Sequence, residues 1–430
     1  MADPVSASSL QLVDRWIGVP LCLLFTGVRK IVDLFADAAD PAAAQKPKRL
    51  LFVKFAEQGS TVLAQGAIRA ACDMVGSENV YFVVFEENRF ILDILGLVPE
   101  ENVITIRRDT PVELATGALA ALRRIRALEI DTAIDMEFFS RSSAILTYLT
   151  GARRRVGFHT FFGDGPYRGD LMTHRLLYNP FFHTSQIFKS LVLGALQDPE
   201  QLPTYGVVPD AVDRSPVAFI PRPGEVGAVE AILKREAKGE TPGRIILINP
   251  NASDLLPLRK WETERYVEVA RRLLREFPDA TVAMTGAPNE AAPIEEAARR
   301  VGSSRCFSLA GKTTLRQLMV LYTLSELLIT NDSGPAHFAS LTPVHVITLF
   351  GPETPALFGA PTPRSVPIWL GLACSPCVNA YNNRQSPCRN NLCMQGITVE
   401  RVASEAIRVL NERAASTVGS TEEQGLPALR

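Results

Sequence analysis

Short apolar runs alternate with longer amphipathic stretches along two separate parts of this sequence. The apolar runs are rich in β-branched and aromatic residues, as in the run Val-Tyr-Phe-Val-Val-Phe at 80–85. A run of this kind is typical of a buried strand, and the stretches between the runs are typical of helices. Strands and helices that alternate along a chain predict parallel sheets covered by helices, so we expect an α/β fold.

The two series of expected elements are separated by a Pro- and Asp-rich stretch near 202–223. The first series comprises a strand at 48–54, a helix at 61–75, strands at 80–85 and 102–106, a helix at 111–128, a strand at 131–136 and a helix ending at Tyr148. The second comprises strands at 244–249, 280–285, 306–309, 327–331 and 344–350, helices at 262–277, 290–301 and 314–325, and a last helix from Thr398 to about Ala414.

A length of 430 residues exceeds what one ordinary core accommodates, so two domains are expected. We expect an N-terminal helix and linker at 1–45, a doubly wound domain at 46–213, a second one at 214–413 and a flexible tail at 414–430. Consecutive doubly wound domains predict a ligand site in the cleft between them. The 45 basic and 46 acidic residues leave a net charge of −1, which argues against nucleic acid as a partner.

An uncharged apolar stretch of 13 residues, 16–28, lies between Arg15 and the pair Arg29 and Lys30. It is shorter than the roughly 20 residues that span a bilayer. We expect a helix bent near Pro20 that lies on a membrane surface, with its basic residues at the headgroups. The alternative is a helix packed on the protein's own surface.

The segment 328–338 reads Leu-Ile-Thr-Asn-Asp-Ser-Gly-Pro-Ala-His-Phe. It predicts a strand that ends at Asn331, a turn, and a helix capped by Ser333 with Pro335 in its first turn. The free N–H groups at such a helix start favour an anion such as a diphosphate, to which His337 would add a donor. The alternative is an ordinary capped turn.

Two further loops follow strands of the same domain. Lys260 lies after the strand at 244–249, where its charge would neutralise phosphate. Glu290 lies after the strand at 280–285, where its carboxylate would accept hydrogen bonds from ribose hydroxyls. Either residue alone is weak evidence, since each also suits an ordinary helix start. The carboxyl ends of parallel strands share one edge, so the combination predicts a nucleotide site.

The sequence resembles glycosyltransferase family 9, the ADP-heptose:lipopolysaccharide heptosyltransferase group, over about 49–410. The stretches that carry the resemblance are Ile-Asn-Pro-Asn-Ala-Ser at 248–253, Arg-Lys-Trp at 259–261, Thr-Gly-Ala-Pro-Asn-Glu at 285–290, Leu-Ala-Gly-Lys-Thr at 309–313, Asn-Asp-Ser-Gly-Pro-Ala-His at 331–337, Leu-Phe-Gly-Pro at 349–352, Ala-Ile-Asp-Met at 133–136 and Gly-Ala-Arg-Arg-Arg-Val-Gly-Phe at 151–158. The most specific is the segment at 331–337.

The resemblance implies a GT-B fold and inverting, metal-independent transfer from a nucleotide-diphospho-sugar. It places Lys260 at the donor phosphate, Glu290 at the ribose, and four residues of the 331–337 segment at the diphosphate and sugar. Those four are Asp332, Ser333, Gly334 and His337. The acceptor would bind the N-terminal domain, where Arg141 and Arg153 to Arg155 would hold an anionic glycolipid.

The sequence departs from the family in the loop after the first strand, Phe-Ala-Glu-Gln-Gly-Ser-Thr at 55–61. Ser60 stands where the heptosyltransferases carry the aspartate proposed as catalytic base. A serine does not deprotonate a hydroxyl at neutral pH without a base of its own, and Glu57 lies three residues earlier. We therefore expect Glu57 to be the base, and the change leaves heptose itself open as the sugar.

Four of the seven cysteines crowd into one short stretch, as Cys374, Cys377, Cys388 and Cys393. Their spacing suits a tetrahedral structural zinc site beside the cleft, with no part in the chemistry. A disulfide pair and free thiols are the alternatives. The other three cysteines, and the histidines at 159, 174 and 183, are expected to be structural.

These observations together predict an inverting glycosyltransferase that needs no cofactor for catalysis. We expect it at the cytoplasmic face of the bacterial inner membrane, peripheral or monotopic. Its acceptor would be a lipid-linked saccharide, lipopolysaccharide or exopolysaccharide. The competing hypotheses are another nucleotide-sugar enzyme on the same fold, such as an epimerase or hydrolase, and a non-catalytic nucleotide-sugar-binding protein.

Overall fold

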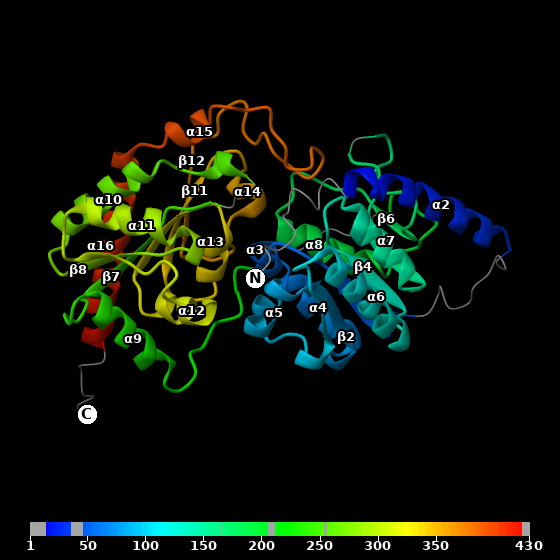
Figure 1. Cartoon of the computed structure of the whole chain (residues 1–430), viewed down its shortest axis with the longest axis horizontal. Coiled ribbons are helices and arrows are strands. Elements are labelled where there is room, and N and C mark those ends of the chain that lie inside the picture. Colours follow the sequence, from blue (N-terminus) through cyan, green and yellow to red (C-terminus); the bar gives the residue numbers. More distant parts are fainter. Residues whose placement is uncertain (1–13, 36–45, 164, 205–210, 253–255, 424–430) are drawn as a thin grey trace. The chain divides into compact units, whose positions relative to one another are not determined.

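The computed structural model describes residues 14–35, 46–163, 165–204, 211–252 and 256–423 (Figure 1). The chain forms two compact units, of which the first holds the N-terminal residues up to Val217 and the second begins at Ala218. Two short pieces of later sequence, Ala356–Phe358 and Cys377–Pro387, group with the first unit. The linker expected at 36–45 lies outside the described residues.

The first unit contains a sheet of six parallel strands in the order β3-β2-β1-β4-β5-β6. The strands are β1 (Leu50–Val53), β2 (Val80–Phe85), β3 (Val103–Ile106), β4 (Thr132–Asp135), β5 (Arg154–Phe158) and β6 (His174–Leu176). The main helices are α3 (Gln58–Leu63), α4 (Gln65–Val75), α5 (Arg89–Leu95), α6 (Pro111–Ala127), α7 (Arg141–Leu149) and α8 (Thr184–Gly194). Alternate strand residues such as Leu51 and Val53 pack with Ile125 of α6 in one core.

The second unit repeats the design with the order β12-β11-β10-β7-β8-β9, again all parallel. Its strands are β7 (Arg244–Asn249), β8 (Ala280–Met284), β9 (Cys306–Ser308), β10 (Leu327–Asn331), β11 (His345–Phe350) and β12 (Ser365–Trp369). Its main helices are α9 (Glu225–Glu236), α10 (Thr263–Glu276), α11 (Ala291–Val301), α12 (Leu315–Thr323), α13 (Gly334–Ala339), α14 (Pro355–Phe358), α15 (Leu392–Gln395) and α16 (Val399–Glu423). Helices α10, α11 and α16 bury one face of the sheet in a continuous apolar core.

Both sheets place their first strand beside their fourth, β1 beside β4 and β7 beside β10. In each sheet the second and third strands lie on one side of the first strand, and the fourth to sixth strands lie on its other side. The loops that leave the two strands therefore diverge, and the space between them is where doubly wound sheets bind ligands. We therefore expect ligand-binding residues in the loop after β1 and in the loops after β7 and β10.

The N-terminal helix α2 (Gly18–Phe35) packs along α7 (Figure 1). Cys22, which is fully buried, joins Ala144, Leu171 and Met172 in a small core. Gly169 (φ 76°) completes the fit, because a β-carbon there would lie 3.0 Å from the carbonyl oxygen of Cys22. One face of the helix therefore packs on the protein's own surface, which is the alternative that the sequence analysis gave.

The other face of α2 stays exposed. Its exposed apolar side chains are Leu23, Leu24, Val28, Ile31, Val32, Leu34 and Phe35, and Trp16 and Ile17 precede them. Within the described part of the chain, no helix combines the length and apolar character needed to cross a membrane.

The predicted bounds of the elements agree best with the structure where the apolar run in the sequence is continuous. The strands at 80–85, 244–249 and 327–331 have the bounds that the sequence predicts. Strands β5, β6 and β12 and helices α8 and α9 were not predicted, because polar residues interrupt them. The last helix was predicted too short, since α16 continues to Glu423 and so includes part of the expected flexible tail.

Candidate active site

The side-chain amide of Asn331 holds the loop after β7 and the start of α10 at the carboxyl end of β10. Its Oδ1 accepts hydrogen bonds from the Trp261 backbone N–H at 3.2 Å and the Tyr266 hydroxyl at 2.8 Å. Its Nδ2 donates to the carbonyl oxygens of Pro250 at 3.1 Å and Asn251 at 3.2 Å. The side chain is fully buried, so the amide fixes the loop after β7 and the start of α10 against the end of β10.

Lys260 immediately precedes Trp261, and its exposed side chain therefore leaves a fixed point of backbone. Trp261 is fully buried and its indole N–H donates to the Ile397 carbonyl at 3.0 Å. The Lys260 carbonyl accepts from the Asn391 amide at 3.2 Å. The Lys260 side chain is thus an exposed cation on backbone that these contacts fix, which suits a phosphate contact.

Glu290 closes the loop after β8. Its Oε2 accepts from the Ala287 backbone N–H at 2.7 Å, which turns the loop back at the sheet edge. The residue is half-buried, and one carboxylate oxygen is engaged in this bond. The sequence predicted this residue for its place after the strand, and the structure adds that its carboxylate has a fixed direction.

Asp332 and Ser333 follow β10 at the same edge. The Asp332 N–H donates to the Leu349 carbonyl at 3.0 Å, which extends the pairing with β11 beyond the strand's end. The expected side-chain cap is wrong: the Ser333 hydroxyl donates to the Asn331 carbonyl at 3.2 Å and does not cap the helix. Gly334 begins α13, which has six residues with Pro335 in its first turn, and His337 on this helix is buried.

Two residues that the sequence gave no role, Arg259 and Glu353, lie against Asp332. Glu353, in the loop after β11, forms an ion pair with Arg259, and Arg259 Nε lies 3.5 Å from Asp332 Oδ2. Glu353 is 1% exposed, and burial raises its pKa to about 8. Only its contacts with Arg259 and Asp332 mark it as part of the site.

In the first unit, the loop after β1 carries Glu57. The residue has a left-handed backbone (φ 67°), which is rare outside glycine and marks local strain of the kind found at functional sites. Its carboxylate forms an ion pair with Arg384 and accepts a hydrogen bond from the Ser60 hydroxyl at 3.3 Å. Ser60, which the resemblance places at the family's aspartate position, thus contacts the carboxylate that we expect to replace that aspartate.

Two charged side chains, Glu137 and Lys54, lie against the backbone of this loop. The Glu137 carboxylate accepts from the backbone N–H groups of Phe55 at 2.7 Å and Ala56 at 3.1 Å, and lies 4.0 Å from Lys54 Nζ. Lys54 is 1% exposed, and burial lowers its pKa. The network fixes the strand-to-helix turn that presents Glu57, and the sequence offered no signal for it beyond the position of Lys54 at the end of an apolar run.

Asp135 lies at the end of β4 beside this network. It forms an ion pair with the buried Arg168, and Ser143 donates to its Oδ2 at 2.9 Å. Burial raises the pKa of Asp135 to about 6. Because every carboxylate oxygen here has a structural partner, we read this pair as a brace for β4.

The two arginines expected at the acceptor differ in their surroundings. The Arg141 backbone N–H and guanidinium both contact Asp14, at 2.9 and 3.1 Å, and its side chain is largely buried. This pairing ties the residues before α2 to α7, and the acceptor role of Arg141 stays a prediction. Arg153 is exposed at the start of β5.

The cysteines and histidines expected to be structural have structural surroundings. Burial raises the pKa of Cys22 to about 11 and of Cys306 to about 12, so both are unreactive thiols. His174 bonds to Thr173 and the Gln197 carbonyl, and burial lowers its pKa to about 4. His183 caps α8.

Of the four clustered cysteines, Cys374 is exposed, Cys377 and Cys388 are half-buried, and Cys393 is buried. In the described ranges, no group of three or more His, Cys, Asp or Glu side chains is arranged to hold a metal ion. Cys377 belongs to the first unit and the other three to the second. The structural zinc site stays a prediction, for which metal analysis of reduced protein is the test.

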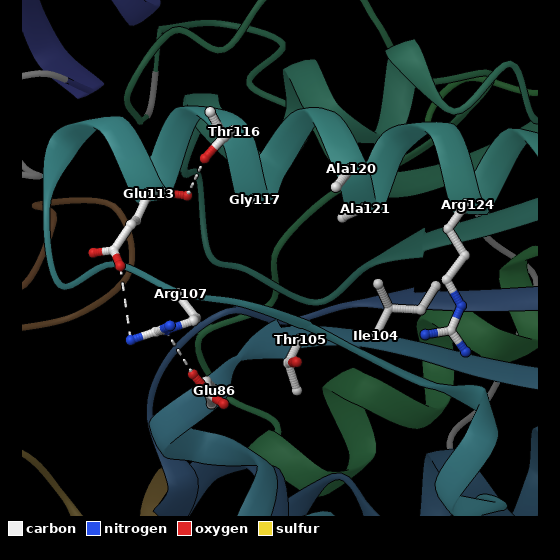
Figure 2. Close-up of a pocket in the computed structure, with 10 residues that line it drawn as sticks. All are labelled: Glu86, Ile104, Thr105, Arg107, Glu113, Thr116, Gly117, Ala120, Ala121 and Arg124. Carbon is white, nitrogen blue, oxygen red and sulfur yellow. Dashed lines mark hydrogen bonds and ion pairs between the residues drawn. The ribbon is translucent and has the colours of Figure 1, made fainter.

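A pocket of about 470 Å³ lies between β3 and α6, and none of the predicted site residues lines it (Figure 2). Its charged groups satisfy one another: Arg107 pairs with Glu86 at 3.3 Å and with Glu113 at 3.7 Å. It also borders an edge strand, away from the junction of β1 and β4. We assign it no role.

Comparison with solved structures identifies the fold. A glycosyltransferase family 9 protein from Veillonella parvula matches with a TM-score of 0.65 and 18% identity over 86% of this chain and 99% of that one. ADP-heptose lps heptosyltransferase II from E. coli matches with a TM-score of 0.62 and 17% identity over 85% and 99%. The two-sheet architecture is therefore the GT-B fold of glycosyltransferases.

Sequence comparison finds a similarity to one family. Residues 224–386, most of which lie in the second unit, match the model for glycosyltransferase family 9 (heptosyltransferase). Lipopolysaccharide heptosyltransferase 2 of Salmonella typhimurium is 30% identical over 100 residues, 23% of this chain and 29% of that protein. Lipooligosaccharide heptosyltransferase 2 of Campylobacter jejuni is 25% identical over 171 residues, 39% and 51%. The chain thus spans about half the length, or less, of these relatives.

We predict that Asn331→Ala destabilises the second unit by about 3 kcal/mol or more, because it removes four hydrogen bonds and leaves buried partners unsatisfied. Urea unfolding measures this change. Asn289→Ala, at an exposed position of the loop after β8, is the matched control and should change stability by less than about 0.5 kcal/mol. Equal effects of the two variants would contradict the role of Asn331.

Proposed function

We propose that this protein is an inverting, metal-independent glycosyltransferase. It transfers heptose or a related sugar from a nucleotide-diphospho-sugar to a lipid-linked or lipopolysaccharide acceptor at the cytoplasmic face of the bacterial inner membrane. The match of residues 224–386 to family 9 and the similarity to lipooligosaccharide and lipopolysaccharide heptosyltransferases support the reaction class. ADP-heptose is the first donor to test, because a solved relative of the same fold carries that name.

One observation carries the proposal: the Asn331 amide gathers the loops after β7 and β10 at the junction of the two strands. Lys260 and Asp332 thereby flank the place where doubly wound sheets bind nucleotides. Neighbouring β8 supplies Glu290 at the same sheet edge.

Each donor residue has a role that its chemistry supports. Lys260 neutralises the diphosphate as it leaves, together with backbone N–H groups at Ser333 and Gly334. Glu290 accepts from the ribose hydroxyls, and Asp332 and His337 face the sugar and its phosphate. A fixed cation and aligned N–H groups stabilise the leaving group electrostatically, so transfer should proceed in the presence of a metal chelator.

The experiment that tests this site is a thermal-shift and calorimetric screen of nucleotide-sugars. We predict saturable stabilisation by one donor, and a loss of affinity of at least about ten-fold in Asp332→Ala and Asp332→Asn. The asparagine variant keeps the side-chain shape, and Glu230→Gln, at an exposed position of α9, is the control. Absence of binding across a broad panel would remove the donor site and with it the proposed reaction.

Glu57 is the base that we propose for the acceptor hydroxyl. The deprotonated hydroxyl attacks the anomeric carbon as the nucleotide diphosphate departs, which inverts the configuration. Arg384 and Ser60 orient the carboxylate, although an ion-paired carboxylate is a weaker base than a free one. Proton transfer late in the reaction, when the hydroxyl is already bonding to carbon, is compatible with such a base.

We predict that Glu57→Gln lowers kcat by about 10²- to 10⁴-fold and leaves donor affinity unchanged, because the amide keeps the shape and cannot take a proton. Single-turnover sugar transfer measures the rate. Glu100→Gln, at an exposed site of the same unit, should have wild-type activity. Full turnover by Glu57→Gln would exclude it as the base, whereas donor binding without turnover in the wild type, across acceptors, would favour the non-catalytic alternative.

The acceptor side of the proposal has two supports. Arg153 is an exposed cation beside β5, suited to an anionic glycolipid. The outward face of α2 adds the exposed apolar side chains, with Arg15 and Lys30 also exposed. Such a combination favours an anionic membrane surface, where the acceptor resides.

We predict that the chain co-sediments with vesicles containing anionic lipid. Replacing Leu23, Leu24, Ile31 and Val32 with serine should reduce this binding by at least about ten-fold, because the apolar area that enters the interface is lost. The control replaces Val112 and Leu119, exposed apolar residues of α6, with serine. Unchanged vesicle binding in the α2 variant would exclude this face as the contact.

A further inference from the structure

Three charged side chains of the second unit form a buried cluster beside the proposed donor residues. Arg259 comes from the segment before α10, Asp332 from the end of β10, and Glu353 from the loop after β11. Asp332 and Glu353 are 3% and 1% exposed, and the Arg259 side chain is 15% exposed. Water therefore contributes little to the solvation of these charges.

One guanidinium serves two buried carboxyl groups in this cluster. The Arg259 guanidinium donates a hydrogen bond to Glu353 Oε2, while Arg259 Nε and Asp332 Oδ2 lie 3.5 Å apart and form no hydrogen bond with any described residue. If both carboxyl groups were ionised, the cluster would carry one uncompensated negative charge in the interior. That arrangement is costly, and a carboxyl group in such a site takes up a proton instead.

We propose that Glu353 is a positioning residue of the donor site, which holds a proton in the resting protein and directs Arg259 toward Asp332. The inference rests on the proposed function, because it assumes that Asp332 meets the donor. A neutral Glu353 leaves one positive and one negative charge, so the cluster does not repel an incoming diphosphate. An ionised Glu353 adds a negative charge beside the donor and weakens its binding.

The neighbouring elements contribute few other titratable groups. Arg259 and Asp332 act on Glu353 directly, and Asp332 raises its pKa further while Arg259 opposes the effect. Helix α13, which packs on β10 and β11, contributes His337, and α15, which packs on β11, contributes the buried Cys393. Neither β12 nor α14 carries a titratable side chain. Burial raises the pKa of Glu353 to about 8, so we expect the proton to be present at neutral pH and lost at higher pH.

The experiment compares wild type with Glu353→Gln, in which the side chain keeps its shape and cannot ionise. The donor dissociation constant is measured by calorimetry between about pH 6.5 and about pH 9.5, with the ADP-sugar found in the screen. We expect the wild-type dissociation constant to rise about ten-fold above pH 8, as one added charge near the diphosphate requires. In Glu353→Gln it should stay constant over this pH range.

A second measurement needs no donor. The infrared band of a protonated carboxylic acid should be present in wild type at neutral pH, disappear as the pH rises through about 8, and be missing from Glu353→Gln. Glu230→Gln controls for the loss of a carboxyl group at an exposed site.

The outcomes separate the inference from the proposed function. Absence of the infrared band, or an equal pH dependence of donor binding in wild type and Glu353→Gln, overturns the role of Glu353. Donor binding that is absent at every pH while the band is present overturns the proposed donor site, and the inferred function of Glu353 with it, but leaves its protonation established. A fall of more than about ten-fold in affinity at neutral pH in Glu353→Gln would show that the carboxyl's shape is not what matters and would also overturn the proposal.

Discussion

The candidate donor site depends on a single buried amide. Asn331 has two donors and two acceptor lone pairs, and all four of its hydrogen bonds go to groups on other segments of the second unit. Tyr266 stays a donor because burial raises the pKa of its hydroxyl well above the ordinary value. No other side chain of similar size both donates and accepts at fixed positions, so this geometry requires an asparagine. The exposed Lys260 and the buried Asp332 take their places from this anchor.

The two units share one strand order but stabilise their loops differently. In the second unit a neutral amide gathers the loops, and the charged cluster of Arg259, Asp332 and Glu353 lies beside it. In the first unit the Glu137 carboxylate binds the backbone of the loop before Glu57. The first arrangement suits an anionic ligand, since it adds no net negative charge while Glu353 is protonated. The second arrangement fixes the turn that carries Glu57, the base that we propose.

The sequence predicted what depends on local pattern. Continuous apolar runs such as 80–85 and 327–331 became strands with the predicted bounds, because a strand buried on both faces has no polar positions. Strand β5 was not predicted, because Arg154 and Arg155 break its apolar pattern and their polar groups are satisfied only in the folded chain. Lys260, Glu290 and Asp332 were proposed as donor residues because each follows a strand, and their roles stay predictions. Glu353 also follows one, but only its distant partners give it a role.

The sequence by itself determined the fold class, the likeness to family 9 and the strand ends that carry the donor residues, since these follow from periodicity and short motifs. Only the tertiary structure decided the partners. It joined Glu57 to Arg384, a residue far along the chain that groups with the first unit, and it gave Arg141 to Asp14. It also showed that the Ser333 side chain does not cap helix α13 as expected. Ion pairs and buried hydrogen bonds form between segments distant in sequence, and no local pattern encodes which pairs meet.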